Sequence, residues 1–133
     1  MCVRQLIQKT LNGLWIPRTA VLRTSDTSAV VNVARGAKTI PAKDALPIDV
    51  IDSIQQQSIE VCSILDKLPH GALNVEFGLD FVLDENYKPW LIEVNSRPRG
   101  RLEHLAKQYP DKYLTEHQES CIQPLLTLAG KIV

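Results

Sequence analysis

Three oxygen-bearing side chains stand close together in the second half of this 133-residue sequence, at a spacing that could form a metal site. Asp80 is followed thirteen residues later by Glu93, and Asn95 comes two residues after that. Two carboxylates and an amide supply the hard oxygen ligands that Mg²⁺ accepts when it also keeps waters and binds phosphate oxygens. These residues could therefore hold a divalent cation, provided that the fold brings them to one surface.

A β-hairpin is expected to bring them together. Apolar residues alternate without a break over 73–83, which predicts a strand with one buried face. After a turn at 84–89, residues 90–95 are expected to form the second strand. A one-residue slip would turn the second apolar set out to water, so matching the apolar faces fixes the register. The expected apolar pairs are Leu83 with Trp90, Phe81 with Ile92 and Leu79 with Val94.

On the other face this register sets the two carboxylates directly opposite each other. The expected pairs are Asp80 with Glu93, Gly78 with Asn95 and Val82 with Leu91. Like charges in a cross-strand pair are unfavourable by up to about 1 kcal/mol, and the hairpin has no counter-charge of its own, so a bound cation would relieve them. Removing either charge should then stabilise the metal-free protein slightly. Gly78 would leave room for nucleotide phosphates. The alternative is an ordinary acidic strand facing solvent.

The rest of the chain predicts one α+β domain, an antiparallel sheet with packed helices. Residues 3–11 and 14–23 are expected to be strands divided by the turn signal Asn12-Gly13. A further strand is expected at 29–34, and residues 36–47 are typical of a loop.

Two helices complete the expected domain. Small or apolar residues recur every three or four positions over 49–68, which predicts an amphipathic helix with Asp49 as its N-cap. Pro69-His70-Gly71 should end it, which makes His70 a helix-end residue rather than a ligand. A second helix is expected after a capping box at 115–118, and Pro124 would kink this helix or mark its first turn.

Composition excludes several classes of protein. Fifteen basic residues balance fifteen acidic ones, so no bulk charge favours nucleic acid or membrane surfaces. The sequence contains no apolar run of the roughly 20 residues that span a bilayer and does not open on a signal peptide, so we expect a cytoplasmic protein. Three scattered cysteines argue against a disulfide framework and a zinc site, and Cys62 is expected in the core.

The hairpin motif resembles the metal signature of the ATP-grasp superfamily. The resemblance lies in Gly-Leu-Asp-Phe-Val-Leu-Asp, in Trp-Leu-Ile-Glu-Val-Asn-Ser and in the loop at 95–98. The wording is most similar to the endospore coat-associated branch. The resemblance implies that Asp80, Glu93 and Asn95 bind Mg²⁺, with Glu93 bridging two ions, and that ATP is the nucleotide.

The resemblance extends more weakly upstream. Residues 6–11 are similar to the hinge strand whose backbone meets adenine, Arg18 to the arginine of the next strand, and 32–36 to an Asn-x-x-x-Gly stretch near the phosphates. It implies phosphate neutralisation by Arg18 and Arg35 as catalytic residues, whereas each could equally be a surface arginine. The implied nucleotide contacts are Gln8, Lys9, Thr10, Arg18, Asn32, Arg35 and Gly36.

The sequence also departs from the family pattern. The usual Asp-x-Arg would read Ile16-Pro17-Arg18, without its acidic member, and the Pro-Gly after the metal asparagine is interrupted by Arg99. The family's N-terminal half, with its glycine-rich lid, has no counterpart in these residues. Residues 1–133 are therefore expected to be the C-terminal portion of an ATP-grasp domain, inactive by itself.

Two functions follow from the resemblance. The first is the ATP- and Mg²⁺-binding half of a carboxylate ligase, which would phosphorylate an unknown carboxylate substrate and pass the acyl phosphate to a nucleophile. The alternative is a truncated, non-catalytic module that binds a partner, such as a spore-associated structural protein or one half of a homo-oligomer. Arg97, Arg99 and Arg101 could grip an anionic substrate or lie in a solvated loop.

Overall fold

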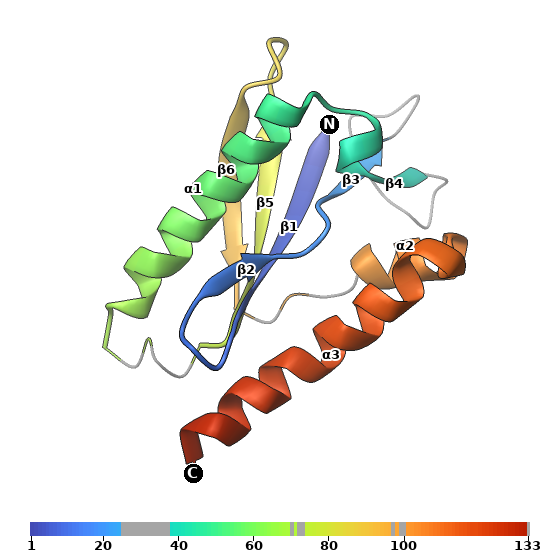
Figure 1. Ribbon diagram of the computed structural model, residues 1–133. Coiled ribbons are helices and arrows are strands. Elements are labelled where there is room, and N and C mark those ends of the chain that lie inside the picture. Colours follow the sequence, from blue (N-terminus) through green and yellow to red (C-terminus); the bar gives the residue numbers. More distant parts are fainter. Residues whose placement is uncertain (25–37, 70, 72–73, 97, 99–100, 133) are drawn as a thin grey trace.

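The computed structural model describes residues 1–24, 38–69, 71, 74–96, 98 and 101–132. Its architecture is α+β, as the sequence predicts, with an antiparallel sheet and packed helices (Figure 1). The strands are β1 (Cys2–Lys9), β2 (Trp15–Pro17), β3 (Val21–Thr24), β4 (Lys38–Pro41), β5 (Glu76–Leu83) and β6 (Pro89–Asn95). The helices are the 3₁₀ helix η2 (Ala42–Asp44), α1 (Ile48–Asp66), α2 (Arg101–Gln108) and α3 (Pro110–Ile132). Within the described residues, no helix is long and apolar enough to cross a membrane.

The sheet is built around β1. Its order is β4-β3-β1-β5-β6, with β2 also pairing β1, and every pair is antiparallel. Strand β1 therefore lies directly beside β5, the first strand of the hairpin, along most of its length. This neighbour could not be read from the hairpin alone, and it determines which side chains surround Asp80.

The strand expected at 14–23 is broken in two. Its first part pairs with residues 7–9 of β1 and its second part with residues 2–4. Between them Arg18 N–H donates to the carbonyl of Leu6 at 2.9 Å, and the buried Gln5 amide donates to the carbonyl of Arg18 at 2.6 Å. The expected turn is present before it, with Gly13 at φ 80° donating to the Thr10 carbonyl. Because Pro17 has no N–H to donate, a continuous ladder cannot pass through this point.

Helix α1 covers one face of the sheet. It runs from Ile48 to Asp66, close to the predicted 49–68, but Asp49 lies in its first turn and Pro47 occupies the N-cap. Proline suits a helix start because its missing N–H would have no partner there. The buried side chains of α1 pack against alternate residues of the two central strands, namely Val3, Ile7, Phe77, Leu79, Phe81 and Leu83.

Helices α2 and α3 lie on the other side of the sheet (Figure 1). A second, smaller cluster joins Val21 to the buried residues Leu102, Leu105, Ala106 and Tyr113. Helix α3 already begins at Pro110, so the predicted start near residue 115 is wrong, and Pro124 lies inside it. The sequence pattern missed α2, because its first turn follows directly on the arginine-rich stretch that was expected to be a loop.

The remaining expectations concern the segments that flank α1. Residues 36–47 were expected to be a loop, but 38–41 form the edge strand β4 and 42–44 a 3₁₀ turn. The β-branched pair Thr39-Ile40 explains this, because such side chains favour a strand, and Pro41 is tolerated at an edge. The strand expected at 29–34 lies outside the described residues, as does His70.

The hairpin register is confirmed at one end and wrong at the other. Asp80 pairs with Glu93, as expected, but a bulge between Asp80 and Phe81 makes Phe81 pair with Leu91. Ile92 is the extra residue. Bulges concentrate on edge strands such as β6, where they turn side chains away from the regular alternation. Trp90 and Ile92 are therefore 53% and 61% exposed instead of buried.

Cys62 provides a test of the core beneath α1. It is fully buried, and burial, with a smaller contribution from Asp66, raises the pKa of its thiol to about 12. Because the thiolate is the reactive form, we expect iodoacetamide at pH 8 to alkylate the exposed Cys121 and to leave Cys62 unmodified. Peptide mass spectrometry would measure this, with guanidinium-unfolded protein as the control in which both thiols react. Equal labelling of the two in the folded protein would contradict the packing described here.

Candidate functional site

Asp80 and Glu93 meet on one face of the hairpin, as predicted. They are directly opposite partners, and Gly78 is the partner of Asn95 on the same side of the bulge. Directly opposed residues of an antiparallel pair project from the same face of the sheet. Asp80 is buried at 8% exposure, whereas Glu93 is exposed. The two carboxylates therefore differ in depth, with Asp80 nearer the sheet and Glu93 open to solvent.

Arg4 supplies the counter-charge that the hairpin lacks. It is the β1 residue directly opposite Asp80, and its Nε and Nη2 donate to the two carboxylate oxygens at 2.7 and 2.6 Å. This hydrogen-bonded ion pair raises the pKa of the Arg4 guanidinium against the opposing effect of burial, and the Glu93 charge adds to the attraction. The expectation that the carboxylates face each other without a counter-charge is therefore wrong, because β1 lies beside β5.

The donor set still fits a magnesium ion that is also held by phosphate and water. A carboxylate offers about four lone-pair positions, and Arg4 engages one on each oxygen of Asp80. Glu93 is exposed, and Asn95 is half-buried on the same face. Within the described residues, no three His, Cys, Asp or Glu side chains are grouped to hold a metal by themselves. The site is therefore suited to a cation that arrives with its own oxygen ligands.

The room expected above Gly78 is occupied by protein. A Cβ added at Gly78 would lie 2.7 Å from the Cβ of Pro98, and 3.7 Å from the Cδ of Arg4. Pro98, three residues after the end of β6, therefore lies directly over Gly78. Gly78 is required for the close approach of Pro98, so the space directly over Gly78 is not open to a phosphate.

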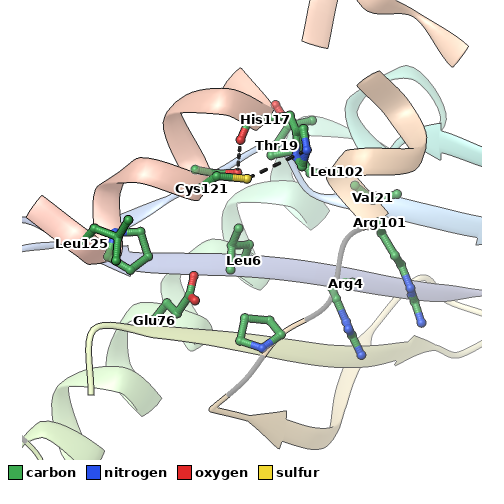
Figure 2. A pocket seen from close by; sticks show the side chains of 13 residues that line it. Arg4, Leu6, Thr19, Val21, Glu76, Arg101, Leu102, His117, Cys121 and Leu125 are labelled. Atoms are coloured by element: carbon green, nitrogen blue, oxygen red, sulfur yellow. Dashed lines mark hydrogen bonds between the residues drawn. The ribbon is translucent and has the colours of Figure 1, made fainter. Parts of the chain in front are cut away.

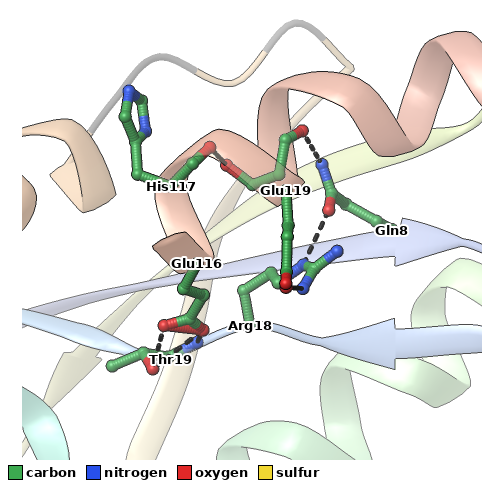
Figure 3. Close-up of polar contacts among 7 residues, drawn as sticks. Gln8, Arg18, Thr19, Glu116, His117 and Glu119 are labelled. Atoms are coloured by element: carbon green, nitrogen blue, oxygen red, sulfur yellow. Dashed lines mark hydrogen bonds and ion pairs between the residues drawn. The ribbon is translucent and has the colours of Figure 1, made fainter. Parts of the chain in front are cut away.

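Arg18 lies in a polar cluster between β1 and α3 (Figure 3). Its Nε donates to the Oε1 of Gln8 at 2.8 Å, and its Nη1 is 3.6 Å from the exposed carboxylate of Glu119. The fully buried Gln8 amide donates to the Ser120 carbonyl at 2.6 Å and to Glu76 at 3.1 Å. In this structure Arg18 and Gln8 fasten α3 to the sheet, and their roles toward a nucleotide stay predictions.

The other implied nucleotide contacts have partners within the fold. The Lys9 ammonium pairs with Asp66 at the end of α1 and lies over the Trp15 ring at 4.9 Å. The Lys9 carbonyl accepts a hydrogen bond from the Thr127 hydroxyl at 2.6 Å, and the Thr10 hydroxyl accepts one from the turn. Asn32, Arg35 and Gly36 lie outside the described residues, so their implied roles stay predictions.

A cavity of about 340 Å³ opens beside this face, between the sheet and helices α2 and α3 (Figure 2). Leu6 of β1 lies at its centre in this view, with Glu76 to one side and Arg4 and Arg101 to the other. The further lining residues are Thr19, Val21, Pro98, Leu102, His117, Ser120, Cys121, Pro124 and Leu125. Because Arg4 lines this cavity and also binds Asp80, the cavity adjoins the candidate metal site.

From the sequence, Arg101 could either grip an anionic substrate or lie in a solvated loop. It is the first residue of α2 and lines the cavity. Burial and the nearby charges of Arg23 and Arg4 lower the pKa of its guanidinium to about 10. Within the described part of the chain, its buried Nη1 has no hydrogen-bond partner. A run of arginines was visible in the sequence, but only the fold shows that one of them is turned inward.

Glu76 is a charged group on this face that the sequence reasoning passed over. It belongs to the same face of β5 as Asp80, four residues earlier, and it is half-buried. Burial raises the pKa of its carboxyl, while the hydrogen bond from Gln8 acts in the opposite direction. The period of two already placed Glu76 with Gly78 and Asp80, so the alternation could have identified it.

Comparison with known proteins gives one family match and several partial relatives. The family model described as YheC/D-like ATP-grasp matches residues 2–122. Tubulin glycylase 3B of Tetrahymena thermophila is 46% identical over 78 residues, which are 58% of this chain and 6% of the glycylase. Tubulin polyglutamylase ttll-4 of Caenorhabditis briggsae and of Caenorhabditis elegans is 68% identical over 22 residues, 16% of this chain and 4% of each enzyme. The chain thus matches only a small fraction of these relatives' lengths.

Proposed function

Because this chain belongs to the YheC/D-like ATP-grasp family, we propose that it is the magnesium- and nucleotide-binding part of an ATP-dependent ligase. The observation that carries this proposal is the pairing of Asp80 with Glu93 and of Gly78 with Asn95 on one face of the hairpin. Partial similarity to a tubulin glycylase and to tubulin polyglutamylases supports the ligase class. The finer assignment to the endospore coat-associated branch stays a prediction.

The proposed reaction has two steps. A substrate carboxylate oxygen attacks the γ-phosphorus of ATP, and ADP leaves with the electrons of the broken bond. The resulting acyl phosphate is attacked by an amine, which loses a proton as inorganic phosphate departs. A magnesium ion, when bound, would screen the charge on the phosphates.

The chain's own residues would position this chemistry. Glu93, Asn95 and the free lone pairs of Asp80 would hold the cation on rigid strands. Arg4 fixes the Asp80 carboxylate through two hydrogen bonds, so the buried ligand keeps one orientation. Arg4 also lies between this face and the adjoining cavity, where a positive charge would stabilise a transferring phosphoryl group.

Binding of Mn²⁺ with ADP tests the proposal without requiring turnover. Electron paramagnetic resonance reports the free Mn²⁺ that remains when the chain and ADP are present. We expect Glu93→Gln to weaken this association by about tenfold or more, as the loss of a charged ligand should. Glu103→Gln is the matched control, because Glu103 is an exposed glutamate on α2 that pairs with Lys107. Equal Mn²⁺ binding by the parent and Glu93→Gln would overturn the proposal.

A further inference from the structure

The cavity between the sheet and helices α2 and α3 has opposite charges at its two sides. Arg4 and Arg101 lie on one side of Leu6, and Glu76 lies on the other (Figure 2). The wall between them is mostly apolar, with Val21, Leu102 and Leu125 among its residues. A cavity that separates a positive from a negative side by an apolar wall is complementary to a ligand with the reverse arrangement.

The positive side has unused hydrogen-bonding capacity. Asp80 compensates Arg4, but the described residues give the buried Nη1 of Arg101 no acceptor. Burial, and then the nearby charges of Arg23 and Arg4, lower the pKa of the Arg101 guanidinium. A buried N–H without an acceptor is unfavourable, so an anionic group bound here would satisfy the donor and balance the second charge.

The negative side is equally specific. Among the described residues, Glu76 receives one hydrogen bond, from the Gln8 amide to its Oε1. Gln8 also accepts a hydrogen bond from Arg18 and donates one to the Ser120 carbonyl, so the amide that binds the Glu76 carboxylate has a fixed position. A half-buried carboxylate with a rigid neutral neighbour favours a ligand ammonium, which would supply the missing positive charge.

The distance between the two sides determines the length of the ligand. Glu76 precedes Asp80 by four residues on β5, which is about 13 Å at the rise of a β-strand. Arg4 is opposite Asp80, and the charge of Arg101 interacts with both residues, so the positive side of the cavity lies near that level. If the side chains stand roughly perpendicular to the sheet, the charged groups are also about 13 Å apart, and subtracting two hydrogen bonds of about 3 Å each leaves roughly 7 Å between the ligand's charges. Two extended residues span that distance.

We propose that this cavity binds a zwitterion of dipeptide length, with its carboxylate on Arg101 and its ammonium on Glu76. The assignment rests on the proposed function only in taking this ligand as a ligase substrate, since the adjoining hairpin would carry the nucleotide. The binding itself depends on neither metal nor ATP. A single amino acid is too short to reach both sides.

Calorimetric titration of the 133-residue chain with glycylglycine tests the inference in metal-free buffer. We expect glycylglycine to bind at least about tenfold more tightly than glycine and than N-acetyl-glycylglycine, which has no ammonium. Glu76→Gln should lose this preference for the free amine, whereas its carbonyl can still accept the Gln8 hydrogen bond and preserve the fold. Arg101→Gln should weaken both peptides alike, and Glu103→Gln should change nothing.

The outcomes separate this inference from the proposed function. Equal affinity for glycylglycine and its N-acetyl derivative would overturn the inference even if Glu76→Gln failed to fold, because that comparison uses the parent chain. Tighter binding of glycine would also overturn it. If glycylglycine binds as expected but Glu93→Gln leaves Mn²⁺ binding unchanged, the inference stands and the proposed function is wrong. If glycylglycine does not bind as expected but Glu93→Gln weakens Mn²⁺ binding, only the inference is wrong.

Discussion

Asp80→Asn is expected to lower the free energy of unfolding by about 2–3 kcal/mol in metal-free buffer, because it removes the charge that forms a hydrogen-bonded ion pair with the partly buried Arg4 guanidinium. An asparagine can accept only one of the two hydrogen bonds and carries no charge. This replaces the expectation from the hairpin alone, in which relief of repulsion between Asp80 and Glu93 would stabilise the protein. Urea denaturation of the parent and the variant would measure the difference.

Glu93→Gln is the matched comparison for this prediction. Glu93 is exposed and has a weaker attraction to Arg4, so its loss should change the free energy of unfolding by less than about 1 kcal/mol. The double variant Arg4→Gln/Asp80→Asn should be more stable than the sum of the single effects predicts, since neither charge of this buried pair remains without the other. If the changes in the free energy of unfolding were strictly additive, or if Asp80→Asn unfolded with the same free energy as the parent, the Arg4 contact would not stabilise the fold.

Because Asp80 pairs with Arg4, the same residue contributes to the stability of the fold and to the proposed cation binding. A carboxylate that only bound metal would repel Glu93 in the empty protein and would depend on the cation for its compensation. With Arg4 in place, Asp80 is compensated before any cation arrives and keeps a fixed orientation. Loss of Asp80 should therefore reduce both stability and Mn²⁺ binding, whereas loss of Glu93 should reduce Mn²⁺ binding alone.

The elements with a strong period were predictable from the sequence. The unbroken alternation over 73–83 identified β5, and the three-four spacing identified α1, because each buries one face against a continuous core. The pairing of Asp80 with Glu93 followed from the same apolar faces. Features of the fold that leave no periodic pattern of apolar residues could not be predicted. The bulge at Ile92 adds one residue to an edge strand, and no pattern of apolar residues records such an insertion.

The candidate site was predictable only within the hairpin. Asp80, Glu93 and Asn95 lie on two strands that are neighbours in sequence, so a local register argument reaches them. Arg4 is 76 residues from Asp80 and meets it because β1 lies between β3 and β5. Strand order is a property of the whole sheet, and a local pattern does not contain it. For Arg101 the sequence left an anion-binding residue and a solvated loop open, and its burial did not follow because its environment includes Arg4 of β1 and Arg23 of β3.

Gly78→Ala is expected to lower the free energy of unfolding by about 1–3 kcal/mol, because overpacking at a buried position forces the backbone or its neighbours to move. The new methyl group would lie 2.7 Å from the Cβ of Pro98, which is part of a ring and cannot swing aside. Pro98 also lines the cavity, so its displacement should weaken glycylglycine binding as well. Thermal and urea denaturation would measure the stability term.

A double-mutant cycle with Pro98→Gly isolates this clash, because glycine removes the Cβ that the alanine would meet. We expect the double variant to be at least about 1 kcal/mol more stable than the sum of the two single effects. Gly13→Ala is the control: at Gly13 an added Cβ meets nothing within 4 Å, but φ is 80°, so the cost is conformational strain alone. Gly13→Ala should therefore show no coupling to Pro98→Gly. If Gly78→Ala were also uncoupled from Pro98→Gly, Pro98 would not lie against Gly78, and its assignment to the lining of the cavity would be wrong.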